Sequence, residues 1–303
     1  MSGADVPVCA NHPDRESHLR CRGCGRPTCP ECQHVSPGGG FVCRDCAVAE
    51  DATGRPAEPR RVAHQPDQTP PPPPTRRRAP RPVVTFGFGI ACIVLYGLQW
   101  LVPSITAMGD FSAVTGYVEP WRFMTATFLH SPATVTHLLF NLMGLYVMGQ
   151  FVEPALGRAR FAAIYLLSGL GGSVGYLLLL PALTDMASVY AWSQPVVGAS
   201  GAIFGLFGAA FLVLRRSGAA VGGMVVLVAL NLALPLVYPN IAWQAHLGGA
   251  VTGLVSTGIV LATLRRPPWT WAGLAGVLIA LVLAALVVYQ LNAAALLSLR
   301  VQF

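Results

Sequence analysis

Seven stretches of about 20 mostly apolar residues follow one another along the chain. Each is long enough to cross a hydrocarbon core of about 30 Å as an α-helix that rises about 1.5 Å per residue. Because backbone polar groups inside a bilayer must be satisfied within the protein, the pattern predicts an all-α polytopic bundle of seven transmembrane helices. The predicted spans are 83–103, 134–153, 160–181, 196–214, 219–238, 241–264 and 269–293.

Composition sets a polar head apart from this membrane body. The whole chain is 53% hydrophobic and 11% charged, against about 25% charged residues in soluble domains. Residues 1–82 nevertheless hold 12 of the 20 basic residues and 9 of the 13 acidic residues. The net charge of +7 does not predict a nucleic-acid partner, because the arginines of the body fall at the ends of predicted helices, where membrane topology explains them.

Arginine placement predicts how the helices are oriented. Positive residues in short loops favour the cytoplasmic side of a membrane. The arginines before span one and after spans two, four and six are Arg76, Arg77, Arg78, Arg81, Arg158, Arg160, Arg215, Arg216, Arg265 and Arg266. The opposite side carries Arg122, and Arg300 in the tail. We therefore expect a plasma-membrane protein with a cytoplasmic N-terminus and an external C-terminus, and its polar first 20 residues predict no cleavable signal peptide.

Polar residues gather at one level of the predicted bundle. Spans two, four and six all begin at the outer leaflet. The first turns of span two carry His137 and Asn141, those of span four carry Ser200, and those of span six carry His246. Polar side chains inside a bilayer are costly unless they are paired or face a cavity. We therefore expect a functional site near the outer leaflet.

Small residues at helical spacing flank Ser200 and His246. They are Gly201, Gly205 and Gly208 on span four, and Ala245, Gly249 and Gly253 on span six. Such ridges let two helices approach closely, which would bring Ser200 Oγ within hydrogen-bond reach of the His246 imidazole. No Asp or Glu of the spans is placed to orient the histidine, so we predict a dyad without a third acid. The competing interpretation is that the small residues serve packing alone.

His137 and Asn141 lie four residues apart and therefore on one helix face. Together with the backbone N–H of Ser200, they could donate hydrogen bonds to the oxyanion of an acyl-transfer reaction. The alternative is that both side chains make interhelical hydrogen bonds that stabilise the bundle. Neither interpretation requires a catalytic cofactor.

Taken together, these motifs resemble those of the rhomboid intramembrane proteases. The resemblance is carried by Gly198-Ala199-Ser200-Gly201, His137-x-x-x-Asn141, Ala245-His246-x-x-Gly249-x-x-x-Gly253 and Trp121-Arg122. It implies that Ser200 is the nucleophile and His246 the base, and that His137, Asn141 and the Ser200 amide form the oxyanion site. It also implies that Trp121-Arg122 belongs to a structural loop resting in the outer leaflet.

The resemblance further implies a six-helix core at residues 83–264, followed by one extra helix and a tail at residues 265–303. Its substrates would be transmembrane segments of other proteins, cleaved near a small residue and a helix-breaking sequence. Span five and the loop after it would act as a gate. Two other functions remain open: an inactive rhomboid-like protein that binds or escorts membrane partners, and a transporter. The presence of both Ser200 and His246 argues against the first, and the lack of intramembrane carboxylates argues against the second.

The N-terminal 50 residues contain four pairs of metal-ligand residues. The pairs are Cys9-x-x-His12, Cys21-x-x-Cys24, Cys29-x-x-Cys32 and Cys43-x-x-Cys46. In a cytosolic head, paired cysteines predict metal binding rather than disulfides, and eight ligands suit two tetrahedral structural Zn²⁺ ions. The spacing favours a cross-braced pairing of the first pair with the third and the second with the fourth, although sequential pairing remains open. His18 and His34 are left as surface residues or as substitutes for one of these ligands.

This head, at residues 1–50, resembles a B-box-type zinc finger and could bind a protein partner in the cytoplasm. Residues 51–82 are rich in Pro and Arg and have no core to bury, so they predict an extended linker. The expected partners of the membrane body are the lipid bilayer and transmembrane protein substrates.

Overall fold

A computed structural model describes residues 7–56, 81–233 and 241–300. The chain divides into two compact units, Met1–Arg77 and Arg78–Phe303, which are described separately. The fold class is confirmed, because a small Cys/His-rich head accompanies a helical membrane body. Most of the predicted linker, including the arginines at positions 76–78, lies outside the described residues.

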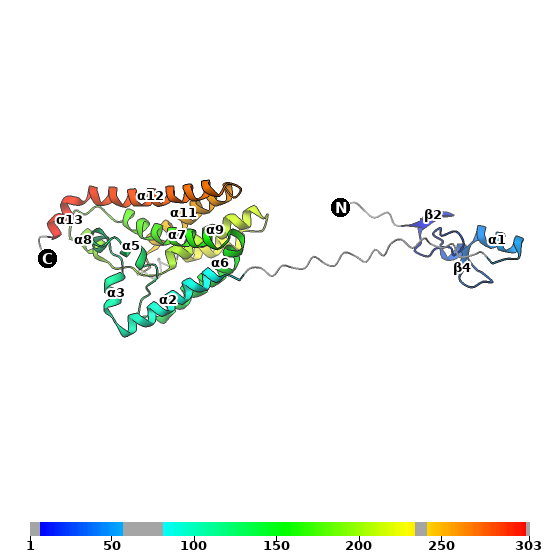
Figure 1. Ribbon diagram of the computed structural model, residues 1–303, viewed down its shortest axis with the longest axis horizontal. Coiled ribbons are helices and arrows are strands. Elements are labelled where there is room, and N and C mark those ends of the chain that lie inside the picture. Colours follow the sequence, from blue (N-terminus) through cyan, green and yellow to red (C-terminus); the bar gives the residue numbers. More distant parts are fainter. Residues whose placement is uncertain (1–6, 57–80, 234–240, 301–303) are drawn as a thin grey trace. The chain divides into compact units, whose positions relative to one another are not determined.

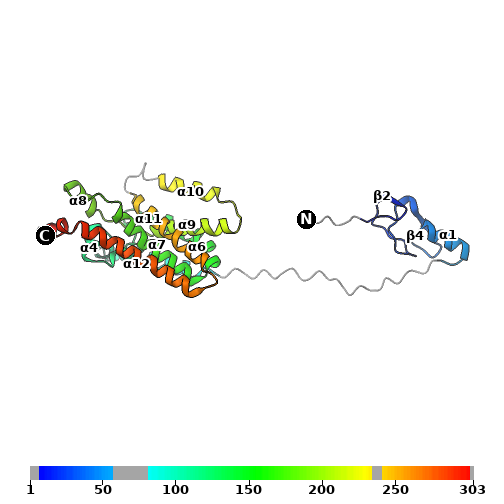
Figure 2. The same ribbon diagram turned by 90° about the horizontal axis from the view of Figure 1, so that it is seen from above.

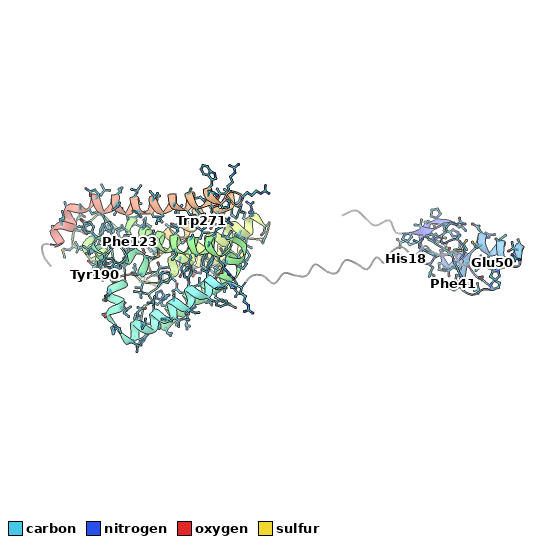
Figure 3. All side chains as sticks on the ribbon, viewed as in Figure 1. His18, Phe41, Glu50, Phe123, Tyr190 and Trp271 are labelled. Atoms are coloured by element: carbon cyan, nitrogen blue, oxygen red, sulfur yellow. The ribbon has the colours of Figure 1, made fainter. Side chains whose placement is uncertain are left out.

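The head is a small arrangement of short strands and one helix (Figure 3). Its elements are β1 (Val8–Cys9), β2 (His12–Glu16), a 3-10 turn at Pro30–Cys32, β3 (Gln33–Val35), β4 (Phe41–Cys43) and α1 (Arg44–Thr53). Strands β1 and β2 pair antiparallel, as do β3 and β4. Helix α1 is tied to the second hairpin by Ser36 Oγ, which donates to the buried carboxylate of Glu50 at 2.7 Å. The two buried clusters of the head consist of cysteines and Val42, so this unit has little apolar core.

Each of the seven predicted spans coincides with a helix in the described part of the body. These helices are α2 (Val83–Leu101), α6 (Val135–Leu156), α7 (Arg158–Leu178), α9 (Ser200–Arg216), α10 (Gly222–Ala233), α11 (Trp243–Ala262) and α12 (Pro267–Leu291). Five of them, α2, α6, α7, α11 and α12, are long and apolar enough to cross a membrane. Helix α9 has 17 residues and α10 has 12, and residues 234–240 of predicted span five lie outside the described residues.

Helix α7 is the centre of the bundle. In its most apolar stretch 67% of the residues are buried, against 11% to 39% in the other four long apolar helices. Figure 1 shows α7 in the middle of the body, with α12 along one side and α2 along the other, and Figure 2 shows α10 at the periphery. The exposed faces of α2 and α12 are mostly apolar, as expected of helices that contact lipid.

Short helices shape the long loop between α2 and α6. They are α3 (Ser104–Gly109), α4 (Ala113–Val118) and α5 (Arg122–Thr125), and two further short helices, α8 (Met186–Ser193) and α13 (Ala293–Arg300), lie after α7 and α12. The loop is organised around Arg122, whose guanidinium donates to the backbone oxygens of Ala107 and Asp110 at 2.7 and 2.9 Å. Arg122 also forms ion pairs with the carboxylates of Asp110 and Glu119.

Trp121 and Arg122, which the resemblance assigns to a structural loop, differ in their surroundings. Trp121 is 54% exposed, but Arg122 is 7% exposed and fully engaged inside the loop. A buried guanidinium requires several acceptors at fixed positions, which only the folded loop supplies. This arrangement supports a structural role for Arg122.

Glu153 near the end of α6 caps the beginning of α2. Its two carboxylate oxygens accept hydrogen bonds from the backbone N–H groups of Val84 and Thr85, at 3.0 and 2.8 Å, and from Thr85 Oγ1 at 2.8 Å. The first N–H groups of a helix have no partner within the helix, and a negative charge at that end is also favoured by the helix dipole. Glu153 is 2% exposed, so this carboxylate joins two spans through a buried contact.

We predict that Glu153→Leu lowers the free energy of unfolding by about 3 kcal/mol, because it leaves buried N–H groups of α2 without an acceptor. The measurement is reversible unfolding of the purified chain in mixed micelles. Glu153→Gln keeps one acceptor oxygen and should fall between the wild type and Glu153→Leu. Gln150→Leu, on the exposed face of the same helix, is the control and should leave stability unchanged. Equal stability of Glu153→Leu and the control would contradict the capping role.

Candidate active site

Ser200 is the first residue of α9 and is presented by an extended segment at residues 194–199. Val196 pairs with Phe111 of the long loop through two backbone hydrogen bonds of 2.7 and 3.1 Å. Gly198 N–H then donates to the carbonyl oxygen of Ala126 at 2.9 Å. The helix therefore starts four residues after the predicted start at residue 196, and Ser200 lies in its first turn, as predicted.

Gly198 explains where α9 begins. Its φ of 134° lies in a region that side chains other than glycine rarely adopt, so the residue cannot continue a helix backwards. A Cβ atom at this position would also come within 2.8 Å of His137 Nε2. Glycine therefore allows both the sharp turn before Ser200 and the close approach of the His137 ring.

Glycines allow α9 and α11 to meet backbone to backbone, as the sequence predicted. A Cβ atom at Gly249 would overlap the carbonyl oxygen of Gly201, and one at Gly253 would overlap the backbone of Gly205. Ala245, which precedes His246, also lies against Gly201, which follows Ser200. The two predicted catalytic residues thus stand on adjacent turns of helices in direct contact.

A third helix takes part in this contact, which the sequence analysis missed. A Cβ atom at Gly172 of α7 would come within 3.2 Å of Gly201 Cα, and one at Gly175 would come within 2.6 Å of Gly248 Cα. The glycine-rich run of α7 was visible in the sequence. However, α7 carries no candidate catalytic side chain. Its glycines alone therefore did not predict that this helix packs beside the site.

His246 is held against an aromatic ring of α9. Its imidazole stacks on Phe204 with ring centroids 4.2 Å apart and planes inclined by 10°. His246 is 9% exposed, and its Nδ1 has no hydrogen-bond partner among the described residues. The ring is therefore held by stacking and packing. Phe204 was not among the predicted site residues, although it lies one turn after Ser200.

No hydrogen bond joins Ser200 Oγ to His246 in the part of the chain that the structure describes. The predicted contact between these two groups therefore stays a prediction. Catalytic hydrogen bonds are often long in the free enzyme and shorten only when substrate binds. The close packing of α9 and α11 brings the backbones next to the two residues together, at Gly201 and Ala245.

His137 presents one particular ring nitrogen to the segment before Ser200. The backbone N–H of Ser131 donates to His137 Nδ1 at 3.2 Å, so in a neutral ring the proton lies on Nε2. Nε2 faces Gly198, so this N–H is available as a donor beside Ser200. Asn141 uses one amide hydrogen on the carbonyl oxygen of His137, at 2.8 Å.

His130 is a buried residue of the outer loop that had no predicted role. It is fully buried, its ring lies 5.3 Å from that of His137, and neither ring nitrogen has a hydrogen-bond partner among the described residues. Burial lowers the pKa of His130 to about 4, so the ring is neutral at physiological pH. Gln99 of α2 holds its backbone through hydrogen bonds of 2.8 and 3.1 Å, which fixes the approach to α6.

A small cavity of about 40 Å³ opens beside Ser200. Its walls come from the long loop, α7, the 194–199 segment and the start of α11, and nearly all of them are small residues: Ala126, Thr127, Gly169, Gly172, Ser173, Val196, Val197, Gly198, Ser200, Gly201, Ala242 and Ala245. The cavity is too small for a large side chain. It is polar in part, because Thr127 and Ser173 contribute to the wall.

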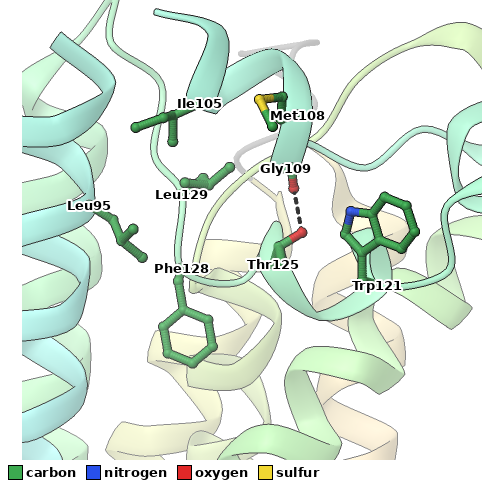
Figure 4. A pocket seen from close by; sticks show the side chains of 8 residues that line it. All are labelled: Leu95, Ile105, Met108, Gly109, Trp121, Thr125, Phe128 and Leu129. Atoms are coloured by element: carbon green, nitrogen blue, oxygen red, sulfur yellow. Dashed lines mark hydrogen bonds between the residues drawn. The ribbon is translucent and has the colours of Figure 1, made fainter. Parts of the chain in front are cut away.

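A second, larger pocket of about 280 Å³ lies between α2 and the long loop (Figure 4). It is lined almost entirely by apolar side chains, and the hydrogen bond from Thr125 Oγ1 to the carbonyl oxygen of Gly109 closes one side. None of the predicted catalytic residues lines this pocket. The candidate active site is therefore the small cavity beside Ser200 and not the larger hollow.

The head brings its eight predicted ligands together in two groups. One group is Cys9, His12, Cys29 and Cys32, and the other is Cys21, Cys24, Cys43 and Cys46. The ligand atoms of each group lie within 4.8 Å of one another, and all the thiols are free. In this grouping the first pair joins the third and the second joins the fourth, as the spacing favoured.

Distances within the two groups fit tetrahedral metal sites. Cys24 Sγ and Cys43 Sγ are 3.7 Å apart, and His12 Nδ1 lies 3.4 and 3.3 Å from the sulfurs of Cys29 and Cys32. Zinc–sulfur bonds of about 2.3 Å in a tetrahedron place two sulfurs roughly 3.8 Å apart. Backbone hydrogen bonding at Cys29 and Asn11 lowers the pKa of Cys9 to about 6, which favours the thiolate that binds metal. The head can therefore hold a metal ion in each group.

Comparison with known proteins agrees with the geometry of the body. A family model described as the Rhomboid domain matches residues 117–263. The putative rhomboid protease YdcA of Bacillus subtilis is 36% identical over 188 residues, which cover 57% of this chain and 86% of that protein. The chain belongs to the rhomboid family. The matched Rhomboid domain contains both Ser200 and His246.

Two longer rhomboid relatives show the same match over a smaller share of their length. RHOMBOID-like protein 2 of Arabidopsis thaliana is 35% identical over 160 residues, which cover 50% of this chain and 45% of that protein. Rhomboid protease GluP of Bacillus subtilis is 34% identical over 143 residues, which cover 45% of this chain and 25% of that protein. This chain therefore spans less than half of either relative. The matched Rhomboid domain includes neither the Cys/His-rich head nor α12.

We predict that Gly253→Ala lowers the free energy of unfolding by about 1–3 kcal/mol, because the new methyl group meets the backbone of Gly205, which cannot move aside. Unfolding in mixed micelles measures the effect. Gly258→Ala on the same helix is the matched control, since a Cβ atom there meets nothing within 4 Å. Equal stability of the two variants would show that α9 and α11 are not in backbone contact.

Proposed function

We propose that this rhomboid is a serine-type intramembrane endopeptidase that cleaves transmembrane segments of other membrane proteins. Ser200 is the nucleophile and His246 the general base. The observation that carries the proposal is the contact between α9 and α11, where Gly201 and Ala245, the immediate neighbours of the two residues, lie against each other. Proteins named as rhomboid proteases are similar to this chain, and the matched Rhomboid domain contains both residues.

The proposed reaction is an acyl transfer in two steps. Ser200 Oγ attacks the carbonyl carbon of the scissile peptide while its proton passes to His246, which then protonates the leaving amine. The negative charge on the tetrahedral intermediate is stabilised by the N–H groups of Ser200, His137 Nε2 and Asn141. Water then attacks the acyl-enzyme with His246 as base and releases the second product. Stacking on Phe204 keeps the imidazole in place without an acidic partner.

The cavity beside Ser200 supports a preference for small residues at the cleavage site. With a volume of about 40 Å³ and walls of Gly, Ala and Ser, it accommodates a side chain such as that of alanine but not an aromatic ring. A substrate segment must also be extended locally for its peptide carbonyl to reach Ser200, so helix-breaking residues near the cleavage site would help. The arginine pattern supports a plasma-membrane protease with its site near the outer leaflet and its N-terminus in the cytoplasm.

One observation favours a second candidate function. Ser200 and His246 share no hydrogen bond among the described residues, and such a gap would also fit an inactive rhomboid-like protein that binds or escorts membrane partners. The two functions differ in whether Ser200 reacts as a nucleophile. Chemical labelling of the serine separates them directly.

Purified full-length protein in liposomes should be labelled by a fluorophosphonate probe at Ser200. Ser200→Ala and His246→Ala should lower kcat for a transmembrane substrate by roughly 10⁴- to 10⁶-fold, because each removes a group that takes part in bond making. Ser193→Ala, a serine on the exposed surface of α8, is the matched control and should label and cleave like the wild type. If wild type and Ser200→Ala label to the same extent, the chain is not a serine protease and the escort function stands.

We further propose that the head holds two structural Zn²⁺ ions, one in each group of ligands. All four positions of each site are taken by protein ligands, so these ions would stabilise the fold and not take part in catalysis. Because the head has little apolar core, metal binding would supply most of its folding free energy. Proteolysis would then continue without the head, since the residues proposed for the chemistry all lie in the membrane body.

Elemental analysis of the full chain should find two zinc ions per protein. Replacing Cys9 and Cys29 together by Ser should leave one zinc, because both belong to the same cross-braced site. Sequential pairing would place these cysteines in different sites, and the double variant would then lose both ions. Cys92→Ser, in α2, should keep two ions. Recovery of no zinc in the wild type would overturn the metal proposal.

A further inference from the structure

The C-terminal end of α12 makes specific contacts with the loops at the active-site end of the bundle. Tyr289 is 7% exposed, and its hydroxyl donates to the carbonyl oxygen of Ala113 at 3.1 Å. Asn292, at the end of the helix, accepts a hydrogen bond from the backbone N–H of Leu183 at 2.9 Å through Oδ1. One residue thus holds the loop between α2 and α6, and the other holds the loop between α7 and α9.

The Tyr289 ring lies between these two loops. It contacts Phe123 and Tyr117 of the first loop, with centroid distances of 6.2 and 5.3 Å, and Trp192 of the second, at 6.3 Å. A Cβ atom at Gly116 would come within 2.9 Å of the Tyr289 hydroxyl, so the first loop fits closely around this side chain. Figure 1 shows the same end of α12 running into α13 beside α8.

Both loops are connected to Ser200, through a few residues of chain and through one pair of backbone hydrogen bonds. Ala113 lies two residues after Phe111, and Phe111 pairs with Val196 through two backbone hydrogen bonds. Trp192, on the other side of Tyr289, begins the stretch that continues through Val196 to Ser200. Tyr289 therefore contacts residues on both segments that form the pairing, namely Ala113 just after Phe111 and Trp192 just before Val196.

We propose that Tyr289 and Asn292 are positioning residues for Ser200, so that the seventh helix completes the active-site scaffold. This inference rests on the proposed function, because it assigns these residues to the alignment of a reacting serine. A nucleophile must lie within a narrow range of distance and angle to the scissile carbonyl, and small displacements lower the rate steeply. Tyr289 and Asn292 reach Ser200 only through the loops, so they do not touch the reacting atoms.

Anchoring in lipid alone does not account for these contacts. Only 11% of the most apolar stretch of α12 is buried, so most of the helix faces outward and is held there by its hydrophobic surface. In its last turns, however, the Tyr289 hydroxyl and the Asn292 side-chain amide form hydrogen bonds with backbone groups of two separate loops. These directional bonds fix loop positions, which hydrophobic contact by itself does not.

The test uses the full chain in liposomes and the variants Tyr289→Phe, Tyr289→Ala and Asn292→Leu. Tyr289→Phe keeps the ring but removes the bond to Ala113, and Asn292→Leu removes the acceptor for Leu183 N–H. Each should lower kcat and the rate of fluorophosphonate labelling at Ser200 about fivefold, with KM unchanged within about twofold. Tyr289→Ala also removes the ring and should lower both rates about 10²-fold.

Tyr190→Phe provides the matched control. Tyr190 lies on α8 in the same outer region, but it is 69% exposed (Figure 3). It should keep wild-type values of kcat and of the labelling rate. Thermal unfolding of each variant is measured in parallel, and Tyr289→Phe should keep the wild-type midpoint within about 2 °C, because its ring packing is intact.

The outcomes separate the positioning role from the function on which it rests. If wild type labels and cleaves while Tyr289→Phe and Asn292→Leu do so at the wild-type rate, the positioning role is wrong and the protease function stands. Loss of activity that follows only the unfolding midpoint, or a rise in KM at constant kcat, also overturns it. If wild type neither labels nor cleaves, the protease function fails and the positioning role fails with it.

Discussion

The contact among α7, α9 and α11 is the constraint on which the rest of the body depends. At Gly201, Gly205, Gly249 and Gly253 one helix backbone lies directly on another, and no side chain of larger size fits between them. Apolar attraction between helices is weak in lipid, so this close approach, with its many van der Waals contacts, supplies the association that water would otherwise drive. It also fixes how near the start of α9 comes to the start of α11.

Much of this arrangement was predictable from the sequence because its causes are local or periodic. The lengths of the apolar stretches indicate the helices, glycines at helical spacing indicate the contact of α9 with α11, and polar side chains stand out against an apolar background. The cross-braced grouping in the head was likewise favoured by spacing, since the short interval between Cys24 and Cys29 makes interleaving easy. In each case a few neighbouring residues carry the information.

Other features depended on partners far away in the sequence. The start of α9 at Ser200 follows from Gly198 and from the pairing of Val196 with Phe111, 85 positions earlier, which no periodicity reveals. The burial of Arg122 could not be predicted either, because two of its acceptors are backbone oxygens that only the folded loop places around it. The same holds for Phe204 beside His246, a contact between two helices whose relative rotation the sequence does not state.

The cap that Glu153 places on α2 also has a consequence for biogenesis. The N–H groups of Val84 and Thr85 leave the ribosome nearly 70 residues before the carboxylate that accepts from them. Until then the first span must satisfy these groups with water or lipid headgroups, so its end stays at the membrane surface. That end can be buried in the protein only after α6 has been synthesised and inserted. The second span thus supplies the acceptor that the first span lacks on its own.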